Sequence, residues 1–392
     1  VTQLCSPNFG YKHFLKLFHR KGLDGADLSR VRLIMNGAEP ISFELCEEFL
    51  DALAPYGLAR TAMFPVYGLA EATVAVSFPE PGRPYQRVVA DRHGLCVGKR
   101  WRPADPGDAD AVSFVKVGRA VRHCRLRIAG EDDSPVPDGI VGHIQVAGVN
   151  VTRGIYGDPD VDAALFTRDG WLRTGDIGFL DAGELVITGR SKDIIIVNGQ
   201  NYYPHDLEEI IARIEGLDLG KVVVCGVSCA PRRSEELVVF LQHRRCLESF
   251  RPLADAARDA LGARAGLEAD RVLPVPRIPK TTSGKLQRAL LASAYADGAF
   301  DQMLAALAPP ARAADAAEEG TDPLVDELLA ICRAFAKDRP IGPDDNLFEI
   351  GVSSLTLTEI ILAIDEKHPG KVDISDLFDY PTVHELAAFI RS

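Results

Sequence analysis

The sequence predicts an α/β protein followed by a separate all-α domain, and three observations support this fold class. Residues 1–189 alternate short β-branched runs with amphipathic helical patterns, which is typical of α/β domains. Residues 190–300 repeat this alternation on a smaller scale. A stretch rich in Ala, Pro and charged residues, predicted as a linker over 301–321, then leads to a tail, 322–392, in which helical periodicity dominates.

In the first region, the sequence predicts strands and helices in alternation. Residues 30–40 indicate a strand that ends in a Gly turn, and residues 41–57 indicate a helix. That helix would bury one face, formed by Cys46, Phe49, Leu50 and Leu53. Two strand-like runs flank residues 67–71. Further strands are expected within 124–129, 140–148 and 184–189.

Between Pro79 and Val117 the periodicity fades while Pro, Asp and Arg accumulate. We expect this stretch to be an irregular insertion in the first region.

In the second region, a helix enters through Pro204, because proline fits the first helical position. Strands follow within 221–227 and 236–243, then a helix, a strand leading into residues 278–288, and a last helix. These elements predict a small α/β unit.

The tail shows two amphipathic helical faces and predicts a four-helix bundle. The first face would consist of Leu324, Leu328, Cys332 and Phe335, and the second of Leu357, Ile360, Ile361 and Ile364. The tail holds 14 Asp and Glu against 6 Lys and Arg, a net charge of −8.

Composition excludes several classes of function. The 392 residues are 46% hydrophobic and 26% charged, as expected for a soluble globular protein of two or three domains. A net charge of −12 argues against non-specific nucleic-acid binding, and no apolar run reaches the length of a membrane span. Of eight cysteines only Cys225 and Cys229 are close, without a second pair for zinc. We therefore expect free thiols and a cytoplasmic location. The sequence begins without Met, and we expect it to be the C-terminal portion of a longer protein.

The stretch "IPKTTSGKLQR", residues 278–288, contains a Ser-Gly-Lys turn that resembles half of a phosphate-binding P-loop. A P-loop needs glycine five positions before Gly284, where Pro279 stands, and Ser or Thr after Lys285, where Leu286 stands. Lys285 therefore needs another explanation.

Three ordered stretches resemble the motifs of adenylate-forming enzymes, which include acyl-CoA ligases, luciferases and nonribosomal-peptide adenylation domains. They are "YGLAEAT" (67–73), "WLRTGDIGFLDAGELVITGRSKD" (171–193) and "PKTTSGKLQR" (279–288). "SPNFGY" (6–11), "NGAEP" (36–40) and the Ala at position 70 narrow the resemblance to fatty acyl-AMP ligases. The resemblance covers residues 1–300. It implies a partial adenylation large lobe over 1–189 with an insertion at 79–117, and a small mobile C-terminal lobe over 190–300.

The resemblance also implies roles for individual residues. Lys285 would be the catalytic lysine, donating to the substrate carboxylate and the α-phosphate of ATP, and Glu71 would hold Mg²⁺. Asp176, in a strand-to-hairpin turn, would accept hydrogen bonds from the ribose, and Arg190 would contact ribose and phosphate. Lys192 would be the hinge of the small lobe. The adenine pocket would be formed by Asn36, Gly37, Ala38, Glu39 and Tyr67.

Each of these residues also has an ordinary structural interpretation. Lys285, Arg190 and Lys192 could be solvated surface side chains, Glu71 an exposed carboxylate at a helix start, Asp176 an Asx-turn residue and Tyr67 a core tyrosine. The phosphate-gripping loop of the family would lie upstream of residue 1.

The tail sequence "DNLFEIGVSSLTLTEI" resembles acyl carrier proteins around their phosphopantetheine serine, and Ser354 matches that serine. A helix N-terminus suits a phosphodiester, although Ser at this position is commonly a simple N-cap. Ser353 stands where most carriers have Asp.

The sequence thus predicts a fatty acyl-AMP ligase portion fused to an acyl carrier protein, using ATP, Mg²⁺ and 4′-phosphopantetheine. It would form acyl-AMP and pass the acyl group to the carrier thiol, as a loading unit for lipopeptide or polyketide synthesis. Expected partners are a fatty acid, a phosphopantetheinyl transferase and downstream polyketide or nonribosomal-peptide synthase domains. One alternative is an acyl-CoA ligase or an amino-acid module, although "SPNFGY" lacks the Asp that would pair a substrate amine. The other is a non-catalytic carrier and docking fragment.

Overall fold

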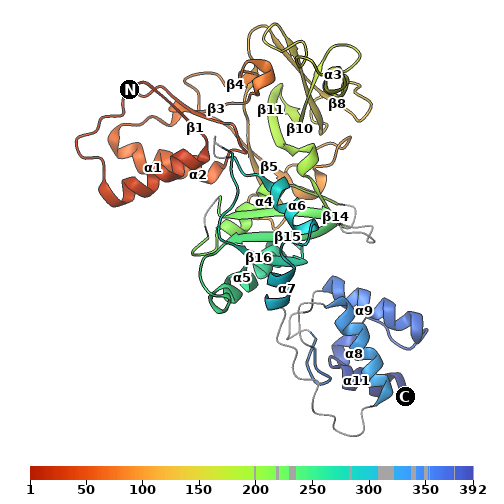
Figure 1. The fold of residues 1–392 in the computed structure, drawn as a ribbon. Coiled ribbons are helices and arrows are strands. Elements are labelled where there is room, and N and C mark those ends of the chain that lie inside the picture. The colour runs from red at the N-terminus through yellow and green to blue at the C-terminus, as the bar shows by residue number, and fades with distance from the viewer. Residues whose placement is uncertain are drawn as a thin grey trace. The chain divides into compact units, whose positions relative to one another are not determined.

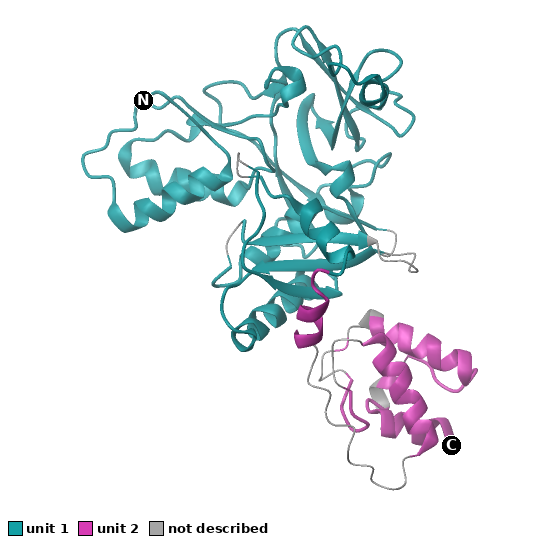
Figure 2. Cartoon of the chain, in the orientation of Figure 1, with its two compact units in different colours: residues 1–298 teal, residues 299–392 magenta. Residues whose placement is uncertain are grey.

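A computed structural model describes most of the chain. The described residues are 1–197, 200–217, 220–228, 235–281, 285–307, 322–336, 341–347, 352, 354–374 and 376–391. The chain divides into two compact units, residues 1–298 and residues 299–392 (Figure 2). The division between a large and a small lobe inside the first unit stays a prediction.

The first unit begins with a small parallel sheet covered by two helices (Figure 1). Its strands, in spatial order, are β1 (Gln3–Ser6), β2 (Leu33–Asn36) and β3 (Met63–Pro65). The helices are α1 (Asn8–Lys21) and α2 (Phe43–Leu53). Ser42 caps α2 by accepting a hydrogen bond from the Leu45 amide, and the predicted face with Phe49 and Leu50 is buried. The period-3.6 pattern of 41–57 is therefore confirmed.

A four-stranded antiparallel sheet follows. Its strands are β8 (Cys124–Ala129), β9 (Gly142–Gly148), β10 (Leu172–Asp181) and β11 (Glu184–Arg190), in the spatial order β11-β10-β9-β8. Helix α3 (Pro159–Leu165) lies between β9 and β10 in the chain. The register between β10 and β9 shifts between Arg173 and Ile177, so β10 bends in its middle.

The expectation that residues 79–117 are irregular is wrong. This stretch contains β5 (Arg87–Asp91) and β6 (Ala111–Val115), which pair antiparallel, and it is bounded by a short pair of β4 (Ser77–Phe78) and β7 (Arg119–Ala120). Val88, Ala90, Val112 and Phe114 are buried at every second position. This period of two is present in the sequence, but each run is only five residues long and is surrounded by Pro and Asp.

The remainder of the first unit is a second α/β assembly. Strands β14 (Val222–Ser228), β15 (Glu235–Gln242) and β16 (Arg271–Val275) form one sheet, and β12 (Ile195–Val197) pairs with β13 (Gln200–Tyr202). Its helices are α4 (Pro204–Ala212), α5 (Leu247–Ala265) and α6 (Arg288–Ala296). Helices α4 and α6 contact β14, and α5 contacts β16. Pro204 is the first residue of α4, as predicted.

Five short 3₁₀ turns connect elements within the first unit. They are η1 (Ala54–Tyr56), η2 (Arg60–Ala62), η3 (Ala70–Ala72), η4 (Arg92–Gly94) and η5 (Ser191–Asp193). Two of them, η3 and η5, carry residues predicted to be functional.

The second unit is helical. It contains α7 (Asp301–Leu307), α8 (Pro323–Phe335), α9 (Ser354–Lys367), α10 (Asp376–Asp379) and α11 (Val383–Arg391). The second predicted face is buried. In the first, Leu328 and Cys332 are buried, whereas Phe335, the last residue of α8, is 40% exposed. Ala336 takes part in the core just beyond α8. The start of the predicted linker is helix α7, and residues 308–321 lie outside the described residues.

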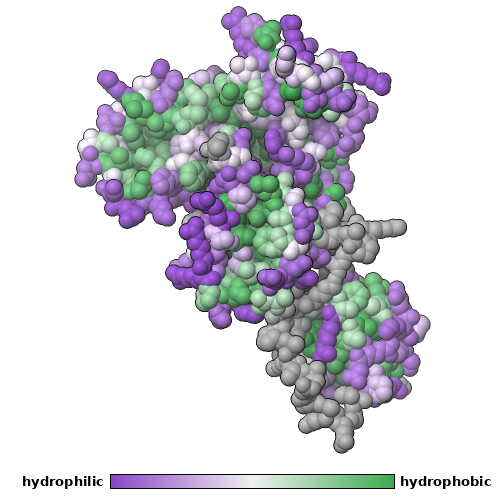
Figure 3. Space-filling model, viewed as in Figure 1, coloured by the Kyte–Doolittle hydropathy of each residue, from purple (hydrophilic) through white to green (hydrophobic). Residues whose placement is uncertain are grey.

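The surface of the first unit mixes polar and apolar patches (Figure 3). On α1, Phe9, Phe14 and Leu17 are exposed. Exposed apolar side chains of this kind are typical of surfaces that pack against another protein surface. Among the residues that the structure describes, no helix has the length and apolarity to cross a membrane.

Candidate functional site

Three residues predicted for nucleotide binding, from three distant segments, meet in hydrogen-bond contact. The Tyr67 hydroxyl donates to Asp176 Oδ2 at 2.6 Å, and Arg190 Nε donates to Asp176 Oδ1 at 3.0 Å. Asp176 was expected in a turn, and this is wrong: it lies inside β10, in the stretch where the register with β9 shifts. Asp176 is the direct cross-strand partner of Arg190 in the β10–β11 pair, and Tyr67 reaches the same carboxylate, so the structure brings together residues 109 and 14 positions apart.

Burial shapes the electrostatics of this group. Tyr67 is buried, and its pKa is raised well above the usual value, first by burial and then by the nearby Asp176 charge. The phenol therefore stays protonated and donates to the carboxylate. Asp176 is buried as well, whereas the Arg190 side chain is 53% exposed. Each carboxylate oxygen keeps a second lone pair, so Asp176 could accept further hydrogen bonds from a ligand hydroxyl.

The predicted adenine loop lies next to Tyr67. Val66 donates its amide hydrogen to the Asn36 carbonyl at 2.8 Å, which joins the end of β2 to the residue before Tyr67. A Cβ on Gly37 would lie 2.6 Å from the Val66 carbonyl oxygen, so only glycine fits here. Ala38 follows in the left-handed region with φ 73°. Asn36, Gly37 and Tyr67 thus belong to one local structure.

Asn8 holds this loop, and the sequence interpretation assigned it no role. Its Oδ1 accepts from Asn36 Nδ2 at 3.0 Å and from the Ser42 amide at 3.4 Å, and its Nδ2 donates to the Pro40 carbonyl at 2.6 Å. Asn8 is buried at the start of α1. A buried amide with three partners across about thirty residues fixes the 36–42 loop. The position of Asn8 within "SPNFGY" was the available signal.

Glu39 is hydrogen-bonded to the start of helix α1, beside the 36–42 loop. Its Oε1 accepts from the Phe9 amide at 3.2 Å, and burial is the first cause of a raised pKa of its carboxyl. Lys280 lies beside the start of α1, with its Nζ 5.3 Å from the centroid of the Phe9 ring. The described part of the 278–288 turn, at Lys280, therefore borders the predicted adenine loop.

Lys285 lies in this turn, but the structure records no contact between it and the other predicted site residues. Its amide donates to Thr281 Oγ1 at 3.0 Å, and its carbonyl accepts from the Thr281 amide. Its side chain is exposed. Residues 282–284 of the same motif lie outside the described residues. Lys192, in η5, is also exposed, and its role as a hinge stays a prediction.

Glu71 lies in η3 on the loop after Tyr67 and is half-buried. Its carbonyl accepts from the Thr152 amide at 2.7 Å. Within the described residues, no three His, Cys, Asp or Glu side chains gather into a metal site. A single carboxylate still fits Mg²⁺ that arrives on nucleotide phosphates, because this ion commonly takes one or two protein carboxylates together with phosphate oxygens.

The insertion and the second α/β assembly are joined by a buried ion pair. Arg92 Nε and its NH2 group donate to the two oxygens of Asp206 at 2.7 and 3.2 Å, and Arg92 also donates to the Arg264 carbonyl at 3.0 Å. The Tyr203 hydroxyl donates to the Leu95 carbonyl at 3.1 Å. The insertion is therefore in a position to restrain the helices α4 and α5.

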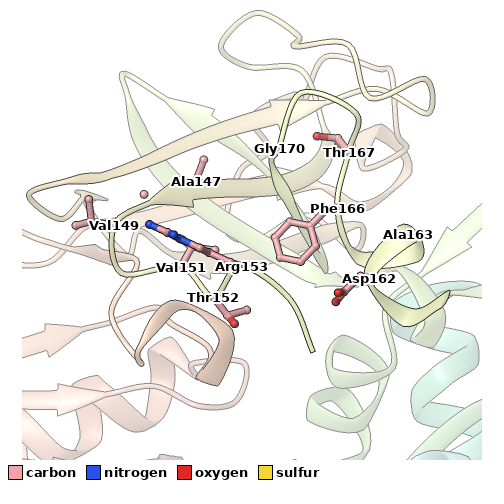
Figure 4. A pocket seen from close by; sticks show the side chains of 11 residues that line it. Ala147, Val149, Val151, Thr152, Arg153, Asp162, Ala163, Phe166, Thr167 and Gly170 are labelled. Carbon is pink, nitrogen blue, oxygen red and sulfur yellow. The ribbon is translucent and has the colours of Figure 1, made fainter. Parts of the chain in front are cut away.

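A separate pocket of about 740 Å³ opens beside the end of β9 (Figure 4). Its lining includes Val149, Arg153, Asp162 and Phe166, with the Phe166 ring and the Arg153 side chain directed into it. None of the predicted site residues lines this pocket. Its lining residue Thr152 donates its amide hydrogen to the Glu71 carbonyl, which links the pocket to the Glu71 loop.

Ser354 is the first residue of α9, as predicted. Its side chain and Ser353 lie outside the described residues. The helix start is compatible with an attached phosphodiester.

Comparisons with known proteins agree with this arrangement. Residues 1–156 match the family of AMP-binding enzymes, and residues 326–390 match the phosphopantetheine attachment site family. The 4-hydroxyphenylalkanoate adenylyltransferase of Mycobacterium marinum is 36% identical over 319 residues, covering 76% of this chain and 50% of that protein. A structure from a study of fatty acyl-adenylate ligases of E. coli and L. pneumophila has a TM-score of 0.69 at 30% identity, over 76% of this chain and 53% of the other.

The McyG A-PCP structure, in complex with phenylalanyl-adenylate, has a TM-score of 0.69 at 25% identity. The match covers all of this chain and 59% of the McyG chain. The predicted fold class and the predicted resemblance to acyl-AMP ligases with a carrier domain are confirmed by these matches. The chain spans about half the length of the curated relatives it matches.

Proposed function

We propose that the protein activates a fatty acid as its acyl-adenylate and loads its own carrier domain, because residues 1–156 match the family of AMP-binding enzymes and residues 326–390 match the phosphopantetheine attachment site family. The observation that carries the proposal is the meeting of Tyr67, Asp176 and Arg190 beside the 36–39 loop. ATP, Mg²⁺ and 4′-phosphopantetheine, predicted from the sequence, are consistent with the two matched families.

In this proposal the chain binds the nucleoside part of ATP. Asp176 accepts from the ribose hydroxyls while Tyr67 and Arg190 hold its carboxylate in place, and the adenine lies against Tyr67 and the backbone of residues 36–39. The preorganised carboxylate strengthens each hydrogen bond because it needs no reorganisation on binding.

The chemical step joins two anions. A carboxylate oxygen of the fatty acid attacks the α-phosphorus, the bond to the β-phosphate oxygen breaks, and pyrophosphate leaves. Glu71 would hold Mg²⁺, which when bound neutralises phosphate charge. Lys285 would donate to the carboxylate and the α-phosphate, where negative charge develops. Since Lys285 lies exposed in its turn, it would reach the nucleotide by movement of the small lobe.

The carrier domain would receive the product. When attached to Ser354, 4′-phosphopantetheine supplies the thiol that accepts the acyl group as AMP departs. A tether between the two units keeps their effective concentration high. A phosphopantetheinyl transferase and downstream synthase domains are the partners that this reading requires.

The identity of the acid substrate is the most specific part of the proposal. The likeness to fatty acyl-adenylate ligases supports a fatty acid, and "SPNFGY" offers no Asp for a substrate amine. The contact of Arg92 with Asp206 supports a restrained small lobe, which would disfavour free coenzyme A as acceptor. An amino-acid module or an acyl-CoA ligase would instead respond to amino acids or to coenzyme A.

The test is fatty-acid-dependent exchange of pyrophosphate into ATP, compared with exchange on amino acids and with acyl-CoA formation. Lys285→Ala should lower exchange by about 100-fold, equivalent to roughly 3 kcal/mol of barrier, without altering the thermal unfolding curve. Lys99→Ala, an exposed lysine of the insertion, serves as the matched control. Exchange by Lys285→Ala within a few-fold of wild type contradicts the assignment. No exchange by wild type favours a non-catalytic docking fragment.

The carrier assignment is tested on the same chain. Treatment with a phosphopantetheinyl transferase and coenzyme A should add one phosphopantetheine mass to the peptide containing Ser354. Ser353→Ala should still be modified, and Ser354→Ala should not. Full modification of Ser354→Ala would refute the assignment.

A further inference from the structure

The loop that carries Glu71 is held in a strained conformation. Thr73 and Val74 both adopt positive φ angles, 50° and 72°. For β-branched residues this region is rarely populated, because it strains the backbone. The Val74 side chain is 75% exposed, so its own burial does not compensate for the strain. Contacts from elsewhere must therefore impose this conformation.

Asn150, just after β9, provides the contacts. Its Nδ2 donates to the Ala72 carbonyl at 3.0 Å and to the Ala75 carbonyl at 2.8 Å, so one amide group bridges both ends of the strained pair. The Asn150 carbonyl accepts from Thr73 Oγ1 at 2.8 Å. These three hydrogen bonds join positions about 75 residues apart.

The turn has little other freedom. The Val74 amide donates to the Leu69 carbonyl, and the Val74 carbonyl lies against Gly68 so closely that a Cβ there would overlap it. Two residues beyond Asn150, the Thr152 amide donates to the Glu71 carbonyl at 2.7 Å. The segment 150–152 therefore contacts the loop at Glu71 itself and at residues 72, 73 and 75, which follow it.

We propose that Asn150 is a positioning residue for Glu71, clamping the strained 70–75 turn so that the carboxylate is presented in one orientation. The inference rests on the proposed function for the role of Glu71. Without the Asn150 amide group, Thr73 and Val74 relax to negative φ angles, and the Glu71 backbone moves with them. Asn150 itself touches no predicted ligand.

Hydrogen exchange on the full chain tests the clamp without any activity. In Asn150→Ala, the amides of residues 72–74, which bond back to Leu69 and Ala70, should exchange at least about 10-fold faster than in wild type. Asn150→Asp keeps the size of the side chain but loses both N–H donors, so the same amides should exchange faster. This variant replaces Asn150→Ala in the test if the Ala variant folds poorly. Ser134→Ala removes a side-chain hydrogen bond in the β8–β9 turn and should leave residues 70–75 unchanged. Exchange within twofold of wild type in both Asn150 variants overturns the inference.

Magnesium dependence tests the link to Glu71. In pyrophosphate exchange, Asn150→Ala should raise the half-saturating Mg²⁺ concentration by about 10-fold while changing the half-saturating fatty acid concentration by less than twofold. A general structural defect would change both half-saturating concentrations or neither, and an unchanged Mg²⁺ profile overturns the positioning role. No exchange activity in wild type refutes the proposed function and its role for Glu71, and the hydrogen exchange then decides the clamp alone.

Discussion

Two arginine–aspartate pairs in the first unit use the same chemistry in opposite surroundings. Arg92 and Asp206 join the insertion to α4 through two parallel hydrogen bonds, and the Arg92 side chain is 2% exposed. Arg190 meets Asp176 through one nitrogen at 3.0 Å, and its side chain is 53% exposed. The first pair is enclosed by protein, whereas the second leaves its guanidinium group in contact with solvent.

This difference separates a structural pair from a binding pair. A buried, bidentate pair fixes two elements relative to each other, and removing one partner leaves a buried charge unpaired. A half-exposed pair contributes little to stability, because water screens it. Ligand binding requires the second arrangement, since a ligand cannot reach hydrogen-bonding groups that are enclosed by protein. The following predictions test this distinction, from the largest expected effect to the smallest.

Arg92→Ala should lower the free energy of unfolding of the first unit by about 3–5 kcal/mol, because Asp206 is left buried and unpaired. Denaturant unfolding measures the effect. The double variant Arg92→Met, Asp206→Leu should recover most of the loss, since an apolar pair has no charge to desolvate. A loss below about 1 kcal/mol in the single variant would show that the pair does not lock the insertion.

Asp176→Asn should weaken ATP binding by about 1.5–3 kcal/mol, the usual size for a hydrogen bond to a charged group. Titration calorimetry with ATP measures it. Tyr67→Phe keeps the ring for the base and removes one donor to the carboxylate, so its effect should be smaller. ATP affinity of Asp176→Asn within twofold of wild type would place the ribose elsewhere.

Glu209→Gln should change the pH dependence of stability. Ser42 Oγ donates to Glu209 at 3.0 Å, and burial, together with the nearby Glu44, raises the pKa of Glu209 from 4.5 to about 8. The folded state then binds this proton more tightly than the unfolded state, so wild-type stability should fall as the pH rises from about 4.5 to 8.

The neutral Gln lacks this dependence. Glu209→Gln should therefore match wild type near pH 5 and be more stable at pH 8, by about 1.4 kcal/mol for each unit by which the pKa is raised. Thermal unfolding at both pH values checks it. Glu48→Gln, on an exposed part of α2, is the control. Parallel pH profiles for wild type and Glu209→Gln would contradict the raised pKa.

Arg190→Gln should lower the free energy of unfolding by less than 1 kcal/mol, because an exposed pair is worth little. Denaturant unfolding of this variant beside Arg92→Ala gives the direct comparison. A loss as large as that of Arg92→Ala would remove the distinction between the two pairs.

Much of the fold was readable from the sequence, because local patterns report burial. The face of α2 with Phe49 and Leu50, the start of α4 at Pro204 and the buried face of α9 followed from periodicity and capping alone. The predictions failed where the pattern is short. Strands β5 and β6 are five residues each, and their pairing depends on a partner more than twenty residues away. Phe335 fits the helical period of its face, yet it lies at the end of α8, where the core gives way to solvent.

The candidate site also has features that follow from local sequence patterns and features that depend on distant residues. The sequence by itself supplied the prediction of which residues carry the chemistry, because the spacing of "YGLAEAT", "GDIGFL" and "TSGK" is a local property of the chain. Only the tertiary structure decided that Asp176 lies in a strand and meets Tyr67 and Arg190, since these contacts depend on strand pairing and on a residue 109 positions away. The same holds for the two carboxamides, Asn8 and Asn150, that hold the 36–42 and 70–75 loops. Most of their partners are backbone carbonyls and amides, which every residue has, so side-chain patterns give little signal for them beyond the place of Asn8 in "SPNFGY".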